Sequence, residues 1–296
     1  MDIIGKKYLY FAISLFVLVP GLVALLLFGL KLSIEFTGGS RVALSYPAKV
    51  SDSQIASVKS SLDAQKIKLI SKQMSGNILS VRTTPMTQSQ DEKLLAQIKE
   101  AKQEEFETIG PTIGAEITQN AIKAIVLASL LIILYITWAF RSVPKPASSF
   151  RFGVCAIAAL IHDVLVVVGV FAILGHFFNV EVDSMFVTAL LTVIGFSVHD
   201  TIVVFDRIRE NLKRFPGMPF DKVVNESILQ TLDRSLNTSL TVILVLTALL
   251  LFGGESIRWF VVALLVGVTS GTYSSIFNAA PLLVLWQELS SKRKKL

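Results

Sequence analysis

The stretch YLYFAISLFVLVPGLVALLLFGL, residues 8–30, decides the fold class of this chain. It carries no charged side chain and, as a helix, is long enough to cross the roughly 30 Å of hydrocarbon in a bilayer. Pro20 and Gly21 lie inside it, and membrane helices tolerate both residues better than soluble helices do. The stretch exceeds the roughly 7 to 15 apolar residues of a signal peptide, and no small-x-small cleavage site precedes Lys31. We therefore predict a retained first transmembrane helix.

Five more apolar blocks of comparable length follow the first one. The composition agrees with them, because the 296 residues are 52% hydrophobic and only 17% charged, with a mean hydropathy of +0.64. We therefore predict a polytopic α-helical membrane protein with six transmembrane helices in a lipid bilayer. The five further blocks are 122–140, 152–178, 184–205, 235–252 and 259–286.

The basic residues of the short loops predict the orientation of the chain, because cytoplasmic loops retain Lys and Arg. These residues are Lys6, Lys7, Arg141, Lys145, Arg151, Arg207, Arg209, Lys213, Arg214, Lys222 and 292–295. The loop 179–183 on the opposite side has no Lys or Arg and two acids. Both termini are therefore predicted to be cytoplasmic. The net charge of +6 follows from this topology, so it does not call for a nucleic-acid partner.

The one long polar stretch follows the first helix and is predicted to lie outside the cytoplasm. IEFTGGSRVALSYP (34–47) has strand-forming residues around a Gly-Gly break, and SDSQIASVKSSLDAQ (51–65) has the cap and the apolar spacing of a helix. KIKLISKQ (66–73) and NILSVRTT (77–84) alternate apolar and polar residues on either side of a turn, which predicts a hairpin.

QDEKLLAQIKEAKQEEF (90–106) is predicted to be a second helix, and FETIGPTIGAEI (106–117) a last strand that runs into the second transmembrane helix. The order strand, helix, hairpin, helix, strand predicts a ferredoxin-like α+β domain. It contains no His or Cys, so we interpret it as a binding module rather than a catalytic one.

Four segments result from this reading. They are the cytoplasmic N-terminus with the first helix (1–30), the extracytoplasmic α+β domain (31–118), a five-helix transmembrane bundle (119–288) and a basic cytoplasmic tail (289–296).

Two His-Asp pairs interrupt the apolar blocks. His162 and Asp163 are predicted to lie near the middle of the membrane, and His199 and Asp200 somewhat closer to the cytoplasm. A charged side chain at the bilayer centre costs at least roughly 2.5 to 3.5 kcal/mol, so such residues are functional candidates. The alternative is that they are neutral or paired inside the bundle and only fix helix packing.

Arg234, at the cytoplasmic start of the fifth block, is the candidate cation for Asp200. Pairing would favour the charged carboxylate and burial would disfavour it, and a carboxylate balanced between the two can exchange a proton. Arg234 could instead reach lipid phosphate, or pair with Asp233 or Asp206.

Two enzyme readings are weaker. Neighbouring residues on a helix point about 100° apart, so neither His-Asp pair can chelate one metal ion through both side chains. Asp163 and Asp200 also lack the Gly-x-Gly-Asp context of intramembrane aspartyl proteases. Cys155 is the only cysteine, which excludes an internal disulfide and a cysteine-based metal cluster. We expect no enzymatic activity, no metal and no cofactor.

Gly267 and Gly271 have the Gly-x-x-x-Gly spacing of a close helix contact. Ser274, Ser275 and Asn278 continue along a similar face, which is most simply part of the same contact and alternatively a polar track through the bundle.

The chain resembles the SecF family, the smaller subunits of the SecDF complex that assists protein export across the bacterial cell membrane. The resemblance runs nearly from end to end. It is carried by IEFTGG (34–39), GPTIGAEI (110–117), HDVL (162–165), VIGFSVHDTIVVFDRIREN (193–211), RSLNTSLT (234–241) and GTYSSIFNAAPLL (271–283).

The resemblance implies that Asp200 and Arg234 correspond to the family residues tied to proton flow. His199 stands where the family commonly has Asn. It also implies membership of the resistance-nodulation-division superfamily, SecD as an obligate partner, and the SecYEG channel and a translocating preprotein as wider partners.

The leading hypothesis is that a proton gradient, or alternatively a sodium gradient, drives export through Asp200, Arg234, His199 and Asp163. The rivals are a half-sized proton-coupled exporter of lipids or small molecules and a purely structural stabiliser of another complex. An exporter should have a substrate-sized apolar pocket between domains.

Overall fold

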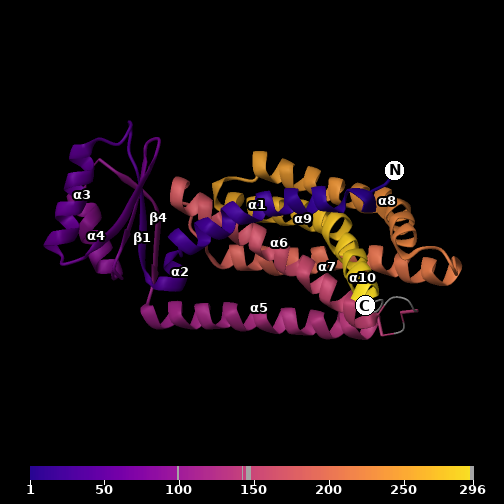
Figure 1. Ribbon diagram of the computed structural model, residues 1–296. Coiled ribbons are helices and arrows are strands. Elements are labelled where there is room, and N and C mark those ends of the chain that lie inside the picture. Colours follow the sequence, from indigo (N-terminus) through magenta and orange to yellow (C-terminus); the bar gives the residue numbers. More distant parts are fainter. Residues whose placement is uncertain (99, 142, 145–147, 294–296) are drawn as a thin grey trace. The chain divides into compact units, whose positions relative to one another are not determined.

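The computed structural model describes residues 1–98, 100–141, 143–144 and 148–293 (Figure 1). Lys145 and residues 294–296 of the predicted basic tail lie outside the described residues. The chain divides into two compact units, which are described separately below. The smaller unit, Lys31–Lys123 with Glu181–Ser184, extends beyond the predicted domain 31–118 and includes a loop that is distant in sequence.

The larger unit is a bundle of long apolar helices. Six helices in the described chain are long and apolar enough to cross a membrane, which confirms the predicted number. The sixth crossing is formed by three consecutive elements, since a π-helical turn, η3, joins α9 to α10. The elements are η1 (Ile4–Lys6), α1 (Lys7–Phe28), α5 (Pro111–Ala139), α6 (Ser149–Phe178), α7 (Ser184–Arg214), α8 (Phe220–Phe252), η2 (Glu255–Ile257), α9 (Arg258–Ser274), η3 (Ser275–Ala279) and α10 (Ala280–Arg293).

Besides α5, which begins at Pro111 rather than at residue 122, two of these helices continue well beyond their apolar blocks. α7 extends past residue 205 to Arg214, and α8 begins at Phe220 rather than at residue 235. Ion pairs three residues apart stabilise the polar extension of α7, with distances of 2.5 Å between Arg209 and Asp206 and 2.9 Å between Arg207 and Glu210. Hydropathy detects only the part of a helix that matches lipid, so it missed both extensions.

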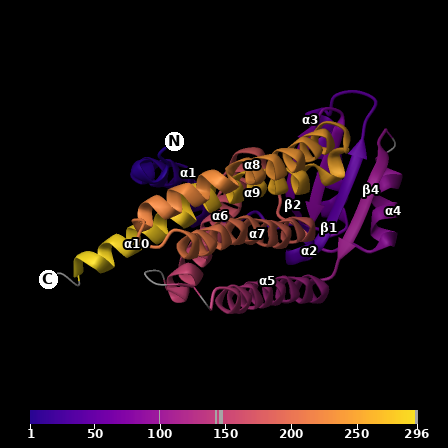
Figure 2. The same ribbon diagram turned by 90° about the vertical axis from the view of Figure 1, so that its right-hand side faces the viewer.

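Glycine brings α1 and α6 into backbone contact. A Cβ atom built on Gly21 would lie 2.9 Å from the Cα of Gly169, and one built on Gly169 would lie 2.7 Å from the Cα of Gly21. Both distances are below van der Waals contact, so no larger residue fits at this crossing without moving a helix. α9 also packs against α6, and α8 runs beside α9 (Figures 1 and 2).

The smaller unit contains a four-stranded antiparallel sheet with the strand order β2-β3-β1-β4. Helices α3 and α4 cover one face of it (Figure 1), and their buried apolar residues form a core with those of the sheet. The elements are α2 (Ile34–Thr37), β1 (Gly39–Ser45), α3 (Asp52–Ala64), β2 (Leu69–Ser75), β3 (Ile78–Thr83), α4 (Gln88–Gln97) and β4 (Lys102–Ile109). The expected order of strand, helix, hairpin, helix and strand is therefore present.

Three local predictions in this unit were wrong. Residues 34–37 form one helical turn rather than a strand, because the Ser33 side chain caps it and Gly38, with φ of 72°, ends it. The second helix stops at Gln97, and 102–109 pairs with β1 as a strand, so sheet pairing overrides local helix propensity. The last strand ends at Ile109, since Pro111 opens α5 at a position where its missing N–H costs nothing.

The loop between α6 and α7 is held by the smaller unit. Glu181 accepts from Arg82 at 3.2 Å and from Arg41 at 3.4 Å. Leu32 and Val182 form a parallel β-bridge, and the Ser184 backbone N–H donates to the Glu35 carboxylate at 2.7 Å. Two transmembrane helices are thus tied at one end to the sheet domain through their connecting loop.

We predict that Gly169→Ala lowers the thermal unfolding midpoint of the purified protein, because the new methyl group would overlap the Gly21 backbone. Overpacking of this kind costs about 1–3 kcal/mol. Gly153→Ala on the same helix is the control, since the nearest atom to its Cβ position is 3.9 Å away. An unchanged midpoint for Gly169→Ala would contradict the close crossing of α1 and α6.

Candidate functional site

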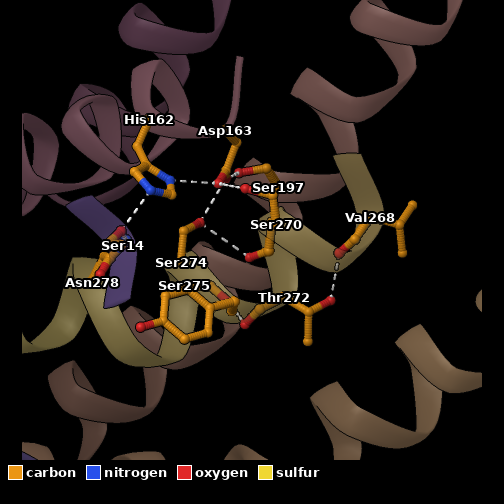
Figure 3. Close-up of polar contacts among 12 residues, drawn as sticks. Ser14, His162, Asp163, Ser197, Val268, Ser270, Thr272, Ser274, Ser275 and Asn278 are labelled. Carbon is orange, nitrogen blue, oxygen red and sulfur yellow. Dashed lines mark hydrogen bonds and ion pairs between the residues drawn. The ribbon is translucent and has the colours of Figure 1, made fainter. Parts of the chain in front are cut away.

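The side chain of Asp163 lies at the centre of a polar cluster inside the bundle (Figure 3) and is fully buried. One carboxyl oxygen, Oδ2, accepts from Ser197 and Ser274 at 2.6 Å each. The other, Oδ1, accepts from Ser270 at 2.7 Å and lies 3.0 Å from Nδ1 of His162. The four partners come from α6, α7 and α9, so one carboxyl group joins three helices.

A second line of contacts leads from His162 to α1 and η3. Nε2 of His162 lies 2.6 Å from the hydroxyl of Ser14, and the amide of Asn278 donates to the same hydroxyl at 2.7 Å. Since Ser14 accepts from Asn278, its own proton is available to Nε2. The Nδ1 proton of His162 is then directed at Asp163, and the network assigns the imidazole tautomer.

This arrangement satisfies the ionised form of Asp163. Three hydroxyl groups and one imidazole N–H converge on its two oxygens, and hydrogen bonds to a charged acceptor are about twice as strong as neutral ones. A buried carboxylate is costly in a membrane unless it is paired in this way. The geometry therefore allows a charge near the middle of the bundle.

Small residues allow α9 to lie close enough to α7 for these contacts. A Cβ atom on Gly271 would lie 3.1 Å from that of Ser197 and 3.7 Å from Oδ2 of Asp163, and one on Gly267 would overlap Val193. Both glycines of the Gly-x-x-x-Gly pair thus face α7. The close approach is what brings the Ser270 and Ser274 hydroxyls to Asp163.

Asp200 is buried differently. Only 3% of the residue is exposed, and within the described part of the chain its Oδ2 atom has no hydrogen-bond partner. The hydroxyls of Ser239 and Thr272 lie beside this carboxyl group and 2.5 Å from each other. Each also lies within donor distance of a helix carbonyl, that of Ser235 or Val268. Asp200 is thus less fully hydrogen-bonded than Asp163.

The other two candidates lie on the surface of the bundle. His199 and Arg234 are both exposed, and no ion pair joins Arg234 to any carboxylate among the residues that the structure describes. The expected pairing of Arg234 with Asp200 is therefore not formed in the isolated chain. Asp206, an alternative partner, pairs with Arg209 instead.

Sequence reasoning found the carboxylates but missed some of their partners. Ser14, Ser197 and Ser270 were not singled out, because a serine hydroxyl in a helix can donate to a carbonyl one turn earlier and so appears at neutral positions. The four-residue spacing of Ser270 and Ser274 on the face of Gly267 and Gly271 is the signal that could have revealed them.

An apolar cavity of about 470 Å³ lies between α1, α6 and α9. Ile13, Val166 and Leu265 contribute to its wall, and His162 and Ser14 lie at its edge. The described residues include no group of three or more His, Cys, Asp or Glu side chains arranged to hold a metal ion.

Comparison with known families gives a match to the family described as "Protein export membrane protein SecD/SecF, C-terminal" over residues 90–289. The protein translocase subunit SecF of Thermobaculum terrenum is 48% identical over 97% of this chain and 94% of its own length. The corresponding subunit of Anaerolinea thermophila is 44% identical, with the same coverage of both chains.

The chain is also similar to the crystal structure of SecDF from Thermus thermophilus, a translocon-associated membrane protein. The TM-score is 0.83 at 32% identity, covering 97% of this chain and 39% of the SecDF chain. A crystal structure of SecDF in a super-membrane-facing form gives a TM-score of 0.71 at 32% identity, over 100% and 40% of the two chains. The extent of these matches shows that the chain belongs to the SecF family of protein translocase subunits, within the SecD/SecF family of protein export membrane proteins.

Proposed function

We propose that this chain uses the proton motive force to assist protein export through the Sec channel, as the SecF-type subunit of a SecDF complex. The observation that carries the proposal is the contrast between two buried carboxyl groups of one bundle. Asp163 has four partners, whereas one oxygen of Asp200 has none among the residues that the structure describes. A carboxyl group whose charged form is incompletely stabilised in a membrane exchanges its proton when its surroundings change.

Asp200, Asp163, His199 and Arg234 form the proposed proton relay. Each proton that moves inward releases about 2.3 kcal/mol per 100 mV of membrane potential, enough to bias a two-state bundle. α6 and α7 carry the two carboxylates, and their connecting loop belongs to the sheet domain through Glu181. A shift of these helices is therefore passed to the domain through that loop. A sodium ion is the alternative coupling ion.

SecD is the proposed direct partner. The SecDF of Bacillus subtilis matches 99% of this chain with only 39% of its own length, which leaves room for a SecD part that a separate chain would supply here. His199 and Arg234 are exposed on the isolated bundle, and polar groups that face lipid are costly. A partner helix packed over these residues would remove that cost. The SecYEG channel and the preprotein complete the proposed assembly.

The exporter alternative gains little from the structure. The apolar cavity of about 470 Å³ is large enough for a small ligand. However, α1, α6 and α9 of the bundle form its wall, whereas an exporter should have a pocket between two domains. We propose that this protein has no enzymatic activity of its own.

The ferredoxin-like domain is proposed to lie outside the cytoplasm, with both termini inside, because the basic loops fall on the opposite side. A reporter fused after Gln73 should be active only outside the cytoplasm, and one fused after Lys213 only inside. The reverse activity at either position would refute this orientation in the bacterial cell membrane.

Asp200→Asn should abolish the stimulation of export by a proton gradient while leaving the protein folded and bound to SecD. The amide keeps hydrogen-bonding capacity but cannot exchange a proton at physiological pH. The measurement is preprotein translocation into membrane vesicles after ATP-driven initiation, with and without an imposed gradient.

Asp206→Asn is the matched control on the same helix, because its carboxylate is partly exposed and paired with Arg209. It should retain the stimulation. If Asp200→Asn retains it fully as well, Asp200 is not the coupling carboxylate.

Arg234→Lys should impair gradient-driven export, because lysine keeps the charge but loses the planar fork with which Arg234 would hold a carboxylate through two hydrogen bonds in the assembled complex. Arg214→Lys, an exposed arginine on α7 that contacts the Phe215 ring, is the control and should export normally. Normal export by both Arg234→Lys and Arg234→Met would mean that Arg234 has no part in the relay.

A further inference from the structure

The hydrogen bonds around Asp163 cannot all persist if this residue binds a proton. Its two oxygens are in contact with four donor groups. This arrangement fits an ionised carboxylate, which can only accept hydrogen bonds. A protonated carboxyl group must itself donate, so one of the donors has to turn toward another acceptor. The structure provides one for Ser274, whose hydroxyl also lies 3.2 Å from the carbonyl oxygen of Gly271. Ser197 and Ser270 make no second hydrogen bond within the described residues.

We propose that Asp163 is a second protonation site of this protein and that Ser274 is the positioning residue that responds to its charge. With Asp163 ionised, the Ser274 O–H donates to Oδ2. When a proton binds Oδ2, the new O–H of Asp163 donates to the Ser274 oxygen, and the Ser274 O–H donates to the Gly271 carbonyl. Every proton is accounted for, and no heavy atom has to leave the cluster.

The move of the Ser274 hydroxyl to the Gly271 carbonyl would change the geometry of the helix at that point. The Gly271 carbonyl also accepts the backbone N–H of Ser275, the last α-helical hydrogen bond before the π turn η3. A serine hydroxyl that donates to a carbonyl of the preceding turn loosens and bends a helix. Turns of π type are frequent at functional sites. Protonation of Asp163 would therefore bend the sixth crossing at the junction of α9 and η3.

Within the described part of the chain, few other titratable groups lie near Asp163. His162 is next to it on α6, and Asp200 is three residues beyond Ser197 on α7. On α9 the nearest in sequence to Ser274 is Tyr273, whose hydroxyl donates to the Tyr10 carbonyl on α1 at 2.7 Å. The inference rests on the proposed proton coupling of the chain, to which it adds that Asp163 itself binds a proton and that Ser274 responds to its charge.

The test measures inward proton flux into sealed lipid vesicles that contain the chain with its SecD partner and a pH-sensitive dye. Ser274→Ala removes one hydrogen-bond donor that stabilises the charged carboxylate of Asp163. A lower proton concentration then suffices to protonate this residue. The pH of half-maximal flux should rise by about one unit, the tenfold effect of one hydrogen bond to a charged group.

Ser275→Ala is the matched control, because this neighbouring buried hydroxyl donates to the Thr272 carbonyl and not to Asp163. Its flux profile should equal that of the wild type. Asp163→Asn should remove the flux. Ser270→Ala removes a donor from the other carboxyl oxygen and should also raise the half-maximal pH, so it serves as the test if Ser274→Ala does not assemble.

An unchanged profile for both serine variants that contact Asp163 would reduce the cluster to helix packing and overturn the inference. If Asp163→Asn keeps the wild-type flux while Asp200→Asn loses it, Asp163 is not a protonation site, whereas the proposed coupling through Asp200 stands. Absence of gradient-dependent flux in the wild type would refute both proposals together.

Discussion

The membrane bundle depends on the requirement that a charged or polar group inside a bilayer finds its partners within the protein. Asp163 meets that requirement through three serine hydroxyls and His162, and these contacts join α6, α7 and α9 at one point. Ser14 and Asn278 extend the network to α1 and η3. The small residues at the same crossings, above all Gly271, let the helices lie close enough for the hydroxyls to reach the carboxylate.

The two carboxylates of the bundle differ in how completely this requirement is met, and in the proposed proton coupling this difference would give each a separate role. Asp163 is saturated with donors, so its protonation must rearrange the cluster, whereas Asp200 retains an oxygen without a partner within the described residues. α9 contributes to both surroundings, since Ser274 contacts Asp163 and Thr272 lies beside Asp200. The C-terminal end of α6 and the N-terminal end of α7 are joined by the loop that contains Glu181, and Arg41 and Arg82 of the sheet domain bind this residue. The same two helices thus carry the carboxylates and the link to the domain.

Most of the architecture could be predicted from the sequence, because a segment that faces lipid must be apolar whatever its tertiary contacts are. The six crossings, the hairpin β2–β3 and the positions of the two His-Asp pairs within the apolar helices follow from local patterns. β4 could not be predicted, because its strand conformation is imposed by pairing with β1 on residues that locally favour a helix. The donors of Asp163 were equally hidden, since Ser197 and Ser270 become polar partners only when α7 and α9 are brought together. The separation of Arg234 from Asp200 is likewise a property of packing.

In the proposed mechanism, carboxyl groups inside the bundle change their protonation state under the conditions that drive export. Infrared difference spectroscopy of the wild-type complex in lipid, recorded across pH, detects this change through the C=O stretch of a protonated carboxylic acid in an apolar environment. We expect a band that appears as the pH falls, with one component missing in Asp163→Asn and another in Asp200→Asn. A spectrum without any titrating carboxylic acid band, or one that both substitutions leave unchanged, would contradict this mechanism.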